Sequence, residues 1–176
     1  MEISQAITSE DLDLTPVFGE LDDATKEQVL SALRRAEATL AAVRDELELT
    51  GETLSLQRYP SGQTEVISSL KTSDGKVTFD VGLRPRNFFS ESPWQPGRAP
   101  RTMVTDAWDV DGAVRVMVRR LVGSHKATIE ESREEIDEER FSSPVDAANA
   151  LAAVAEKLAG LARSREPNVT AWTPAE

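Results

Sequence analysis

The segment from Arg84 to Arg101 concentrates side chains that often mediate recognition. Aromatic residues and arginines are interleaved there with four prolines, and Glu91 is the single acid. Aromatic and arginine residues dominate the energetics of protein interfaces, and loops of this length in compact domains are often functional. We therefore predict a loop over 84–101 that either covers the end of a sheet or binds a partner. Its candidate binding residues are Arg84, Arg86, Phe88, Phe89, Trp94, Arg98 and Arg101.

The remaining polar residues give little evidence for a catalytic site. His125 is the only histidine and follows a Gly-Ser turn, where a solvated role is expected. Nucleophilic catalysis needs a Ser or Cys with a base and an orienting group, and the chain has no cysteine and no Gly-x-Ser-x-Gly motif. Asp80 and Asp106 offer carboxylates for acid–base work, but nothing in the sequence brings them together. We expect no catalytic residues and, on balance, no enzyme.

Metal and cofactor motifs are also lacking. Asp109-Val110-Asp111-Gly112 is similar to the centre of a calcium loop, but the first and twelfth positions would be Ala107 and Val118, which excludes an EF-hand. The acidic run from Glu130 to Glu139 is typical of a solvated face or edge. No glycine-rich phosphate-binding motif occurs. The sequence thus predicts no metal and no cofactor.

The charge of the chain limits its partners. Asp and Glu outnumber Lys and Arg by 31 to 20, which gives a net charge of −11. That balance argues against nucleic acid and anionic membranes, and suits either solubility or binding to a basic protein. No apolar run approaches the roughly 20 residues of a membrane span, and no signal peptide is visible, so we expect a cytoplasmic protein. The expected partner is another protein or a second copy, with a homodimer through the sheet or the Ala-rich helix as one option.

Two helices are predicted from apolar spacing. Over 22–49, Val29, Leu33, Ala36, Leu40, Val43 and Leu47 repeat at four and three residues, with capping residues at the start and Gly51 as the predicted C-terminal cap. Over 143–164, Ser143-Pro144 begins a second stripe of Ala147, Leu151, Val154, Leu158 and Leu161. Six further alanines allow this helix to approach a neighbour closely.

Between the helices the apolar period falls to two, which predicts strands. Turns are expected at Tyr59–Gly62 and at two Asp-Gly pairs, Asp74-Gly75 and Asp111-Gly112. Successive hairpins require an antiparallel sheet. The charged segment 127–141 is either helix or edge strand, and we favour an edge strand broken near Arg133.

These features predict an α+β fold: an antiparallel meander of five to six strands with an N-terminal and a C-terminal helix packed on one face. Residues 1–21 form an arm that packs or frays, 22–164 the single domain, and 165–176, with Trp172, a loose tail. The expected function is non-enzymatic protein binding, chaperone-like or neutralising, through an exposed sheet face or the 84–101 loop. The alternative is a small-molecule-binding domain or enzyme with a pocket between sheet and helices, lined by Tyr59, Trp108, Arg115 and Asp106.

Overall fold

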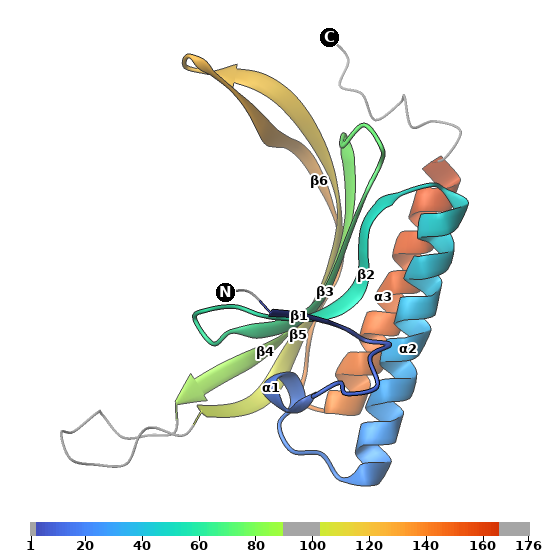
Figure 1. Cartoon of the computed structure of the whole chain (residues 1–176), viewed down its shortest axis with the longest axis vertical. Helices are drawn as coiled ribbons and strands as arrows, with labels where there is room; N and C mark the ends of the chain where they lie inside the picture. The colour runs from blue at the N-terminus through green and yellow to red at the C-terminus, as the bar shows by residue number, and fades with distance from the viewer. Residues whose placement is uncertain (1–2, 90–102, 166–176) are drawn as a thin grey trace, which may run out of the picture.

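The computed structural model describes residues 3–89 and 103–165 and shows one six-stranded antiparallel sheet with three helices (Figure 1). The sheet has the order β1-β2-β3-β4-β5-β6, a simple meander. The elements in chain order are β1 (Ile3–Ala6), α1 (Thr15–Phe18), α2 (Asp23–Glu46), β2 (Thr50–Arg58), β3 (Thr64–Lys71), β4 (Val77–Phe89), β5 (Met103–Val122), β6 (His125–Phe141) and α3 (Pro144–Arg165).

Both long helices lie on one face of the sheet, so the predicted fold class and layer arrangement are confirmed. α3 packs on β4, β5 and β6, and α2 packs on β2 and along α3. The ends of the strands curve away from the helices (Figure 1). No described helix covers the opposite, concave face, which we call the open face.

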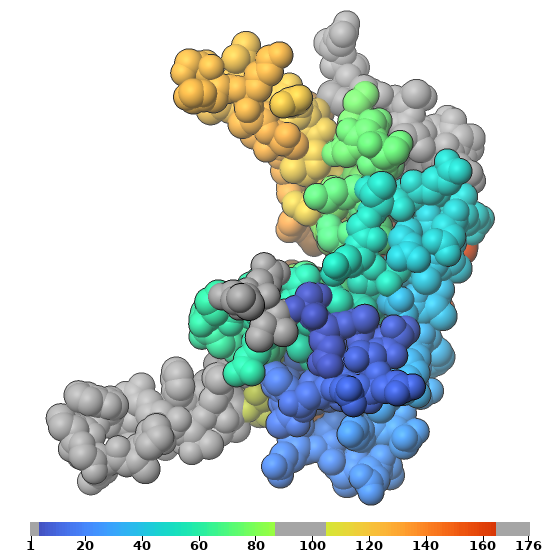
Figure 2. Space-filling model, in the orientation of Figure 1, coloured from blue at the N-terminus to red at the C-terminus, as the bar shows by residue number. Residues whose placement is uncertain are grey.

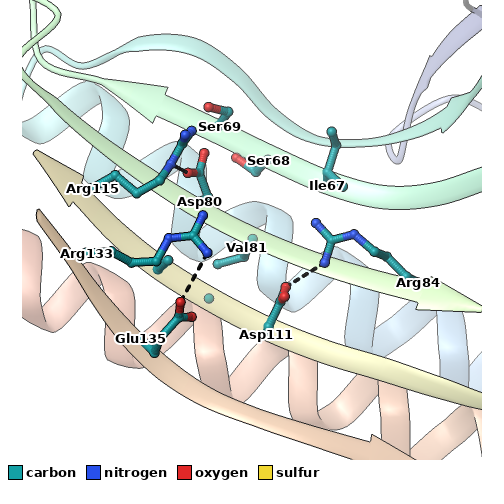
Figure 3. A pocket seen from close by; sticks show the side chains of 12 residues that line it. Ile67, Ser68, Ser69, Asp80, Val81, Arg84, Asp111, Arg115, Arg133 and Glu135 are labelled. Atoms are coloured by element: carbon teal, nitrogen blue, oxygen red, sulfur yellow. Dashed lines mark hydrogen bonds and ion pairs between the residues drawn. The ribbon is translucent and has the colours of Figure 1, made fainter. Parts of the chain in front are cut away.

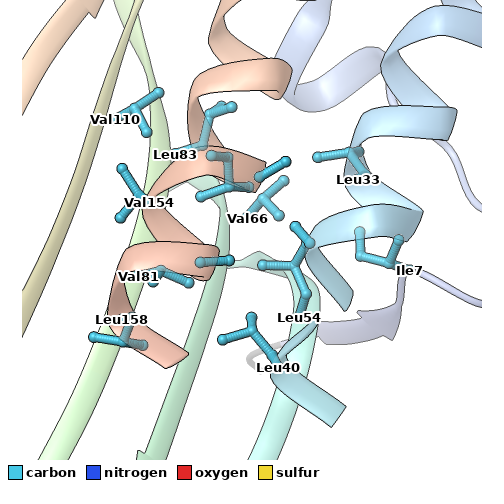
Figure 4. Packing of buried hydrophobic residues seen from close by; sticks show 14 of the residues in the cluster. Ile7, Leu33, Leu40, Leu54, Val66, Val81, Leu83, Val110, Val154 and Leu158 are labelled. Atoms are coloured by element: carbon cyan, nitrogen blue, oxygen red, sulfur yellow. The ribbon is translucent and has the colours of Figure 1, made fainter. Parts of the chain in front are cut away.

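The core between sheet and helices is apolar and closely packed (Figure 4). From α2 it receives the predicted stripe, including Leu33 and Leu40, and from α3 Val154 and Leu158. The buried alanines of α3, among them Ala148 and Ala155, have no bulky side chain and let α2 approach closely. The Ala-rich surface of α3 is therefore used inside the domain.

Polar caps fix where the helices begin. The Asp22 carboxylate accepts a hydrogen bond from the Thr25 backbone N–H at 2.7 Å, and Ser143 Oγ accepts one from the Asp146 N–H at 3.4 Å. The predicted cap at Gly51 is wrong. α2 ends at Glu46, Glu48 adopts the left-handed conformation (φ 54°), and Gly51 already lies in β2, where a Cβ would sit 2.2 Å from the Ser69 carbonyl oxygen.

The N-terminal segment packs on the body, which was one of the two alternatives for it. β1 pairs with β2, and Ile7, Val17 and Phe18 are buried in the core. The Trp108 indole N–H donates to the Val17 carbonyl at 2.8 Å, and the rings of Phe18 and Trp108 lie 6.0 Å apart. Trp108 is thereby held as a core residue beneath α1.

The predicted hairpin at Asp111-Gly112 is wrong, because β5 runs without a turn from Met103 to Val122. Gly112 lies opposite Val81 on one side and Ile136 on the other. A Cβ added to Gly112 would come within 2.6 Å of Val154 Cγ1 on α3. The glycine is thus required for close approach of helix and sheet, which produces the same sequence signature as a turn.

The predicted loop over 84–101 is also too long, because β4 continues to Phe89 and pairs with β5 from there inwards. Arg84 and Arg86 are therefore strand residues. Phe88 and Phe89 pair with Val104 and Met103 through their backbones. Residues 90–102 and 166–176, and with them Trp94, Arg98, Arg101 and Trp172, lie outside the described residues.

The ambiguous acidic segment forms the edge strand β6, as favoured, and the strand continues from His125 to Phe141 without the predicted break. Its register with β5 shifts at Glu131, two residues before Arg133, and at Asp137–Glu138. Asp137 has a positive φ of 34° at the second shift. Each bulge adds one residue to the edge strand, which bends it and disrupts pairing with another edge. The predicted turn at Gly123-Ser124 joins β5 to β6, with Gly123 at φ 61°.

Candidate functional site

The open face is built from the residues that alternate with the core residues along each strand. On β3, Glu65, Ile67 and Ser69 alternate with the buried Val66 and Leu70. The register then aligns them with neighbours on β4 and β5: Ile67 lies opposite Gly82, and Gly82 opposite Asp111. In the next row Ser69 lies opposite Asp80, Asp80 opposite Ala113, and Ala113 opposite Glu135.

Small residues in the middle of these rows leave the open face hollowed. One depression of about 380 Å³ crosses β3 to β6, and a second of about 560 Å³ lies over β2 and β3. Both include Ile67, Ser68 and Ser69, so they form one continuous depression, which we call the trough. Figure 2 shows this side indented between the orange β5–β6 hairpin and the β2–β3 turn.

Arg84 lies flat on the floor of the trough (Figure 3). Its guanidinium group folds back over Gly82, where a Cβ would come within 2.9 Å of its nitrogens. Nε lies 2.7 Å from Glu65 Oε2 and Nη1 lies 2.8 Å from Asp111 Oδ1. Burial by itself lowers the pKa of Arg84, but the hydrogen bonds and charges of Asp111 and Glu65 outweigh it and raise that pKa. The guanidinium therefore remains charged and fixed.

Two further arginines project from the strands beside it (Figure 3). Arg115 Nε lies 2.5 Å from Asp80 Oδ2, and its Nη1 lies 3.7 Å from Glu130 Oε2. Arg133 bonds Glu130 and Glu135, each at 3.1 Å. The hydrogen bond to Glu135 is the main reason that the pKa of Arg133 is raised. The three arginines are thus held in defined positions by carboxylates, from neighbouring strands for Arg84 and Arg115 and from β6 itself for Arg133.

The charges that line the trough are balanced, and two further carboxylates lie beside it. Its lining contains four carboxylates (Glu52, Asp80, Asp111, Glu135) and four cations (Lys71, Arg84, Arg115, Arg133). Glu65 and Glu130 bond these arginines as well, which makes six carboxylates against four cations. Such a surface can accept hydrogen bonds from basic groups and offers guanidinium donors in fixed positions.

The predicted site residues are not brought together as a group. Arg84 lies in the trough, whereas Arg86 is exposed on β4, outside its lining. The residues predicted to line a pocket between sheet and helices are separated: Trp108 is buried in the core, Arg115 lies in the trough and Asp106 is exposed. Tyr59 donates to Glu65 Oε1 at 2.5 Å beside the trough.

Asp80 is paired with Arg115, and Asp106 lies at a register shift farther along β5, so the two carboxylates do not form an acid–base pair. Glu65, Asp111 and Arg133 also line or adjoin the trough and were not predicted as site residues from the sequence. Their signal was the charged residue at alternate positions of apolar strands, as in Val114-Arg115-Val116. Within residues 3–89 and 103–165 no cluster of three or more Asp, Glu or His side chains is suited to hold a metal ion.

No protein-family model matches the chain, no curated protein is significantly similar to it, and no solved structure matches it. None of the described helices is long and apolar enough to cross a membrane.

Proposed function

We propose that this chain is a non-enzymatic protein-binding domain, chaperone-like or neutralising, whose trough receives a basic segment of a partner protein. The observation that carries the proposal is the trough itself: it runs across the open face, no described helix covers it, and six carboxylates lie in or beside it against four cations. The net charge of −11 adds long-range attraction for a basic partner.

The dimensions of the trough suit a polypeptide segment. From β2 to β6 it crosses four inter-strand steps of about 4.8 Å, which makes it about 19 Å long. That length accommodates five or six extended residues, and a helix about 10 Å wide would also lie along it. Fixed arginines between carboxylates would select a segment with alternating charge, because ion pairs of the wrong sign cost affinity.

The alternative function places a small-molecule pocket between sheet and helices. In the described structure that space is filled by core side chains such as Leu54, Val81 and Leu158 (Figure 4), which supports the binding-domain proposal. Arg86, Phe88, Phe89, Trp94, Arg98 and Arg101 stay a second predicted contact region. A chain with residues 91–100 replaced by a short Gly-Ser linker separates the contribution of Trp94 and Arg98 from that of the trough.

Site-specific photo-crosslinking in the native host tests the proposal. A photoreactive residue at Ser69 or Ala113 reports on the trough, and one at Ala38, exposed on α2, is the matched control. We expect Ser69 and Ala113 to capture the same basic protein and Ala38 not to. With that protein purified, Glu52→Lys/Glu135→Lys should weaken binding at least tenfold, and added salt should weaken wild-type binding. Capture of the same set of proteins from Ala38 would contradict the proposal.

A further inference from the structure

The β5–β6 hairpin continues beyond the rest of the sheet. The last pair between β4 and β5 is Val77 with Val116, and the Met117 N–H still donates to the Lys76 carbonyl, so Val118–Val122 pairs only with His125–Ile129. This two-stranded ribbon projects past the other strands (Figure 1). Isolated two-stranded ribbons are marginally stable in water, so a projecting one gains stability when its tip is bound.

The tip of this ribbon differs in chemistry from the rest of the chain. Leu121 and Val122 are 70% and 56% exposed, and within the described residues they are the large hydrophobic side chains left most open to solvent. Arg119 and Lys126 flank them, Arg120 is paired with Glu131 at 2.6 Å, and the sequence from Gly112 to Ile129 contains no carboxylate. The next ten residues, 130–139, contain seven carboxylates and one arginine. The tip is thus basic and apolar in an acidic protein.

The trough offers the complementary surface. It combines carboxylates, six in or beside it against four cations, with an apolar floor of Ile67 and Ala113. A tip cannot reach the trough of its own chain, because both lie on the same strands: Leu121 is six residues beyond Arg115, about 20 Å along β5. Only the trough of another molecule is accessible to it.

We propose that two copies of this chain associate reciprocally, the tip of each (Arg119–Lys126) docking in the trough of the other. This inference rests on the proposed function, since it uses the same trough. In each contact Leu121, which shares one face of the ribbon with Arg119 and Lys126, packs on Ile67, while Arg119 and Lys126 face the carboxylates at the ends of the trough, Glu52 and Glu135. A reciprocal arrangement is closed and forms both contacts at once.

Two other uses of the ribbon fit less well. Pairing of β6 with a second β6 would have to accommodate the bulges at Glu131 and Asp137 and would place carboxylates against carboxylates. An anionic lipid surface would attract the tip but repel the rest of the molecule, whose net charge is −11, and Glu130 and Glu131 lie at the base of the ribbon.

Light scattering over a concentration series at low and high salt provides the first test. We expect a dimer at low salt whose dissociation constant rises at least tenfold in Arg119→Glu/Lys126→Glu and in Leu121→Ser/Val122→Ser. Lys26→Glu/Arg34→Glu makes the same charge change on exposed positions of α2 and should leave the dimer unchanged. A wild-type monomer at all concentrations, open polymers, or a dimer insensitive to the tip variants would each overturn the inference.

Cross-linking provides the second test, because the chain has no cysteine of its own. One copy carries Ser124→Cys at the tip and the other Ser69→Cys in the trough, and a short bis-maleimide is added to the mixture. We expect cross-linked pairs of these two copies, and none when Ala38→Cys replaces Ser69→Cys. Cross-linking only between two Ser124→Cys tips, or binding of a monomer to vesicles rich in anionic lipid, would overturn tip-in-trough docking.

A charge exchange separates this inference from the proposed function. Copies with the reversed tip, Arg119→Glu/Lys126→Glu, and copies with the reversed trough, Glu52→Lys/Glu135→Lys, should each be monomeric and should form a dimer only when mixed. Failure to form that mixed dimer overturns the reciprocal contact. The capture of a basic partner from Ser69 in the native host is a separate readout and does not depend on this result.

Discussion

The two faces of the sheet are made by alternate residues of the same strands, yet different forces act on them. On the helix face, side chains such as Leu83 and Val110 are buried under α2 and α3. Burying a side chain of this size contributes about 1.5–3 kcal/mol. On the open face, partly exposed ion pairs such as Arg133 with Glu135 contribute about 0–1 kcal/mol. Stability therefore comes mainly from one face, which leaves the other free to carry binding chemistry.

Because the helix face supplies most of the stability, we expect truncation of a side chain there to lower the free energy of unfolding strongly. Leu83 is fully buried beneath α3, so Leu83→Ala should lower the free energy of unfolding by about 2–5 kcal/mol. Urea unfolding followed by circular dichroism measures this. Ile67→Ala, on the open face of β3, serves as the matched control and should cost less. An equal loss in both variants would break the distinction between the faces.

A substitution at Gly112 tests whether α3 needs to approach the sheet closely. Gly112→Ala places a methyl group 2.6 Å from Val154 Cγ1, so it should cost about 1–3 kcal/mol through overpacking. Val154→Ala should then be less harmful in the Gly112→Ala background than in the wild type. A double-mutant cycle in urea measures that coupling, and strictly additive losses would contradict the packing explanation.

On the open face, Arg84→Met should cost about 1 kcal/mol, because it leaves the buried Glu65 with Tyr59 but without its cation. Gly82→Ala should disturb the same contacts by displacing the guanidinium group. Both variants should weaken partner binding more than they reduce stability. Thermal unfolding and calorimetric titration on the same samples measure the loss of stability and the loss of partner binding. A loss of stability greater than that of Leu83→Ala would contradict this prediction.

The smallest effect concerns the start of α2. The hydrogen bond from the Thr25 N–H lowers the pKa of Asp22 in the folded state. A lowered folded pKa means that the carboxylate stabilises the fold above its unfolded pKa of about 3.9, and that this contribution is lost as the pH falls through the folded pKa. Asp22→Ala should therefore be less stable than wild type at pH 7, and the difference should shrink in acid. A difference that stays constant down to pH 3 would contradict this cap.

Local sequence patterns correctly predicted those elements whose formation depends mainly on interactions between residues close in sequence. The spacing of Val29, Leu33 and Leu40 and the cap at Asp22 defined α2, because amphipathic periodicity and capping act within a few turns. The Asp-Gly pairs show where this fails. Asp74-Gly75 lies in a turn, with φ 71° at Gly75, while Asp111-Gly112 lies within β5. The two dipeptides have the same sequence, and the packing of α3 on Gly112 is what distinguishes their structures.

The sequence by itself therefore determined the fold class, the two long helices, the meander and the acidic character of the chain, since periodicity, turns and charge are local or additive properties. The tertiary structure alone decided that Glu65, Arg84 and Asp111 meet, because their proximity depends on the register of three strands. It also decided that the Asp111-Gly112 pair extends a strand, and that Leu121 and Val122 project beyond the sheet. These features depend on contacts between distant parts of the chain, which no local pattern encodes.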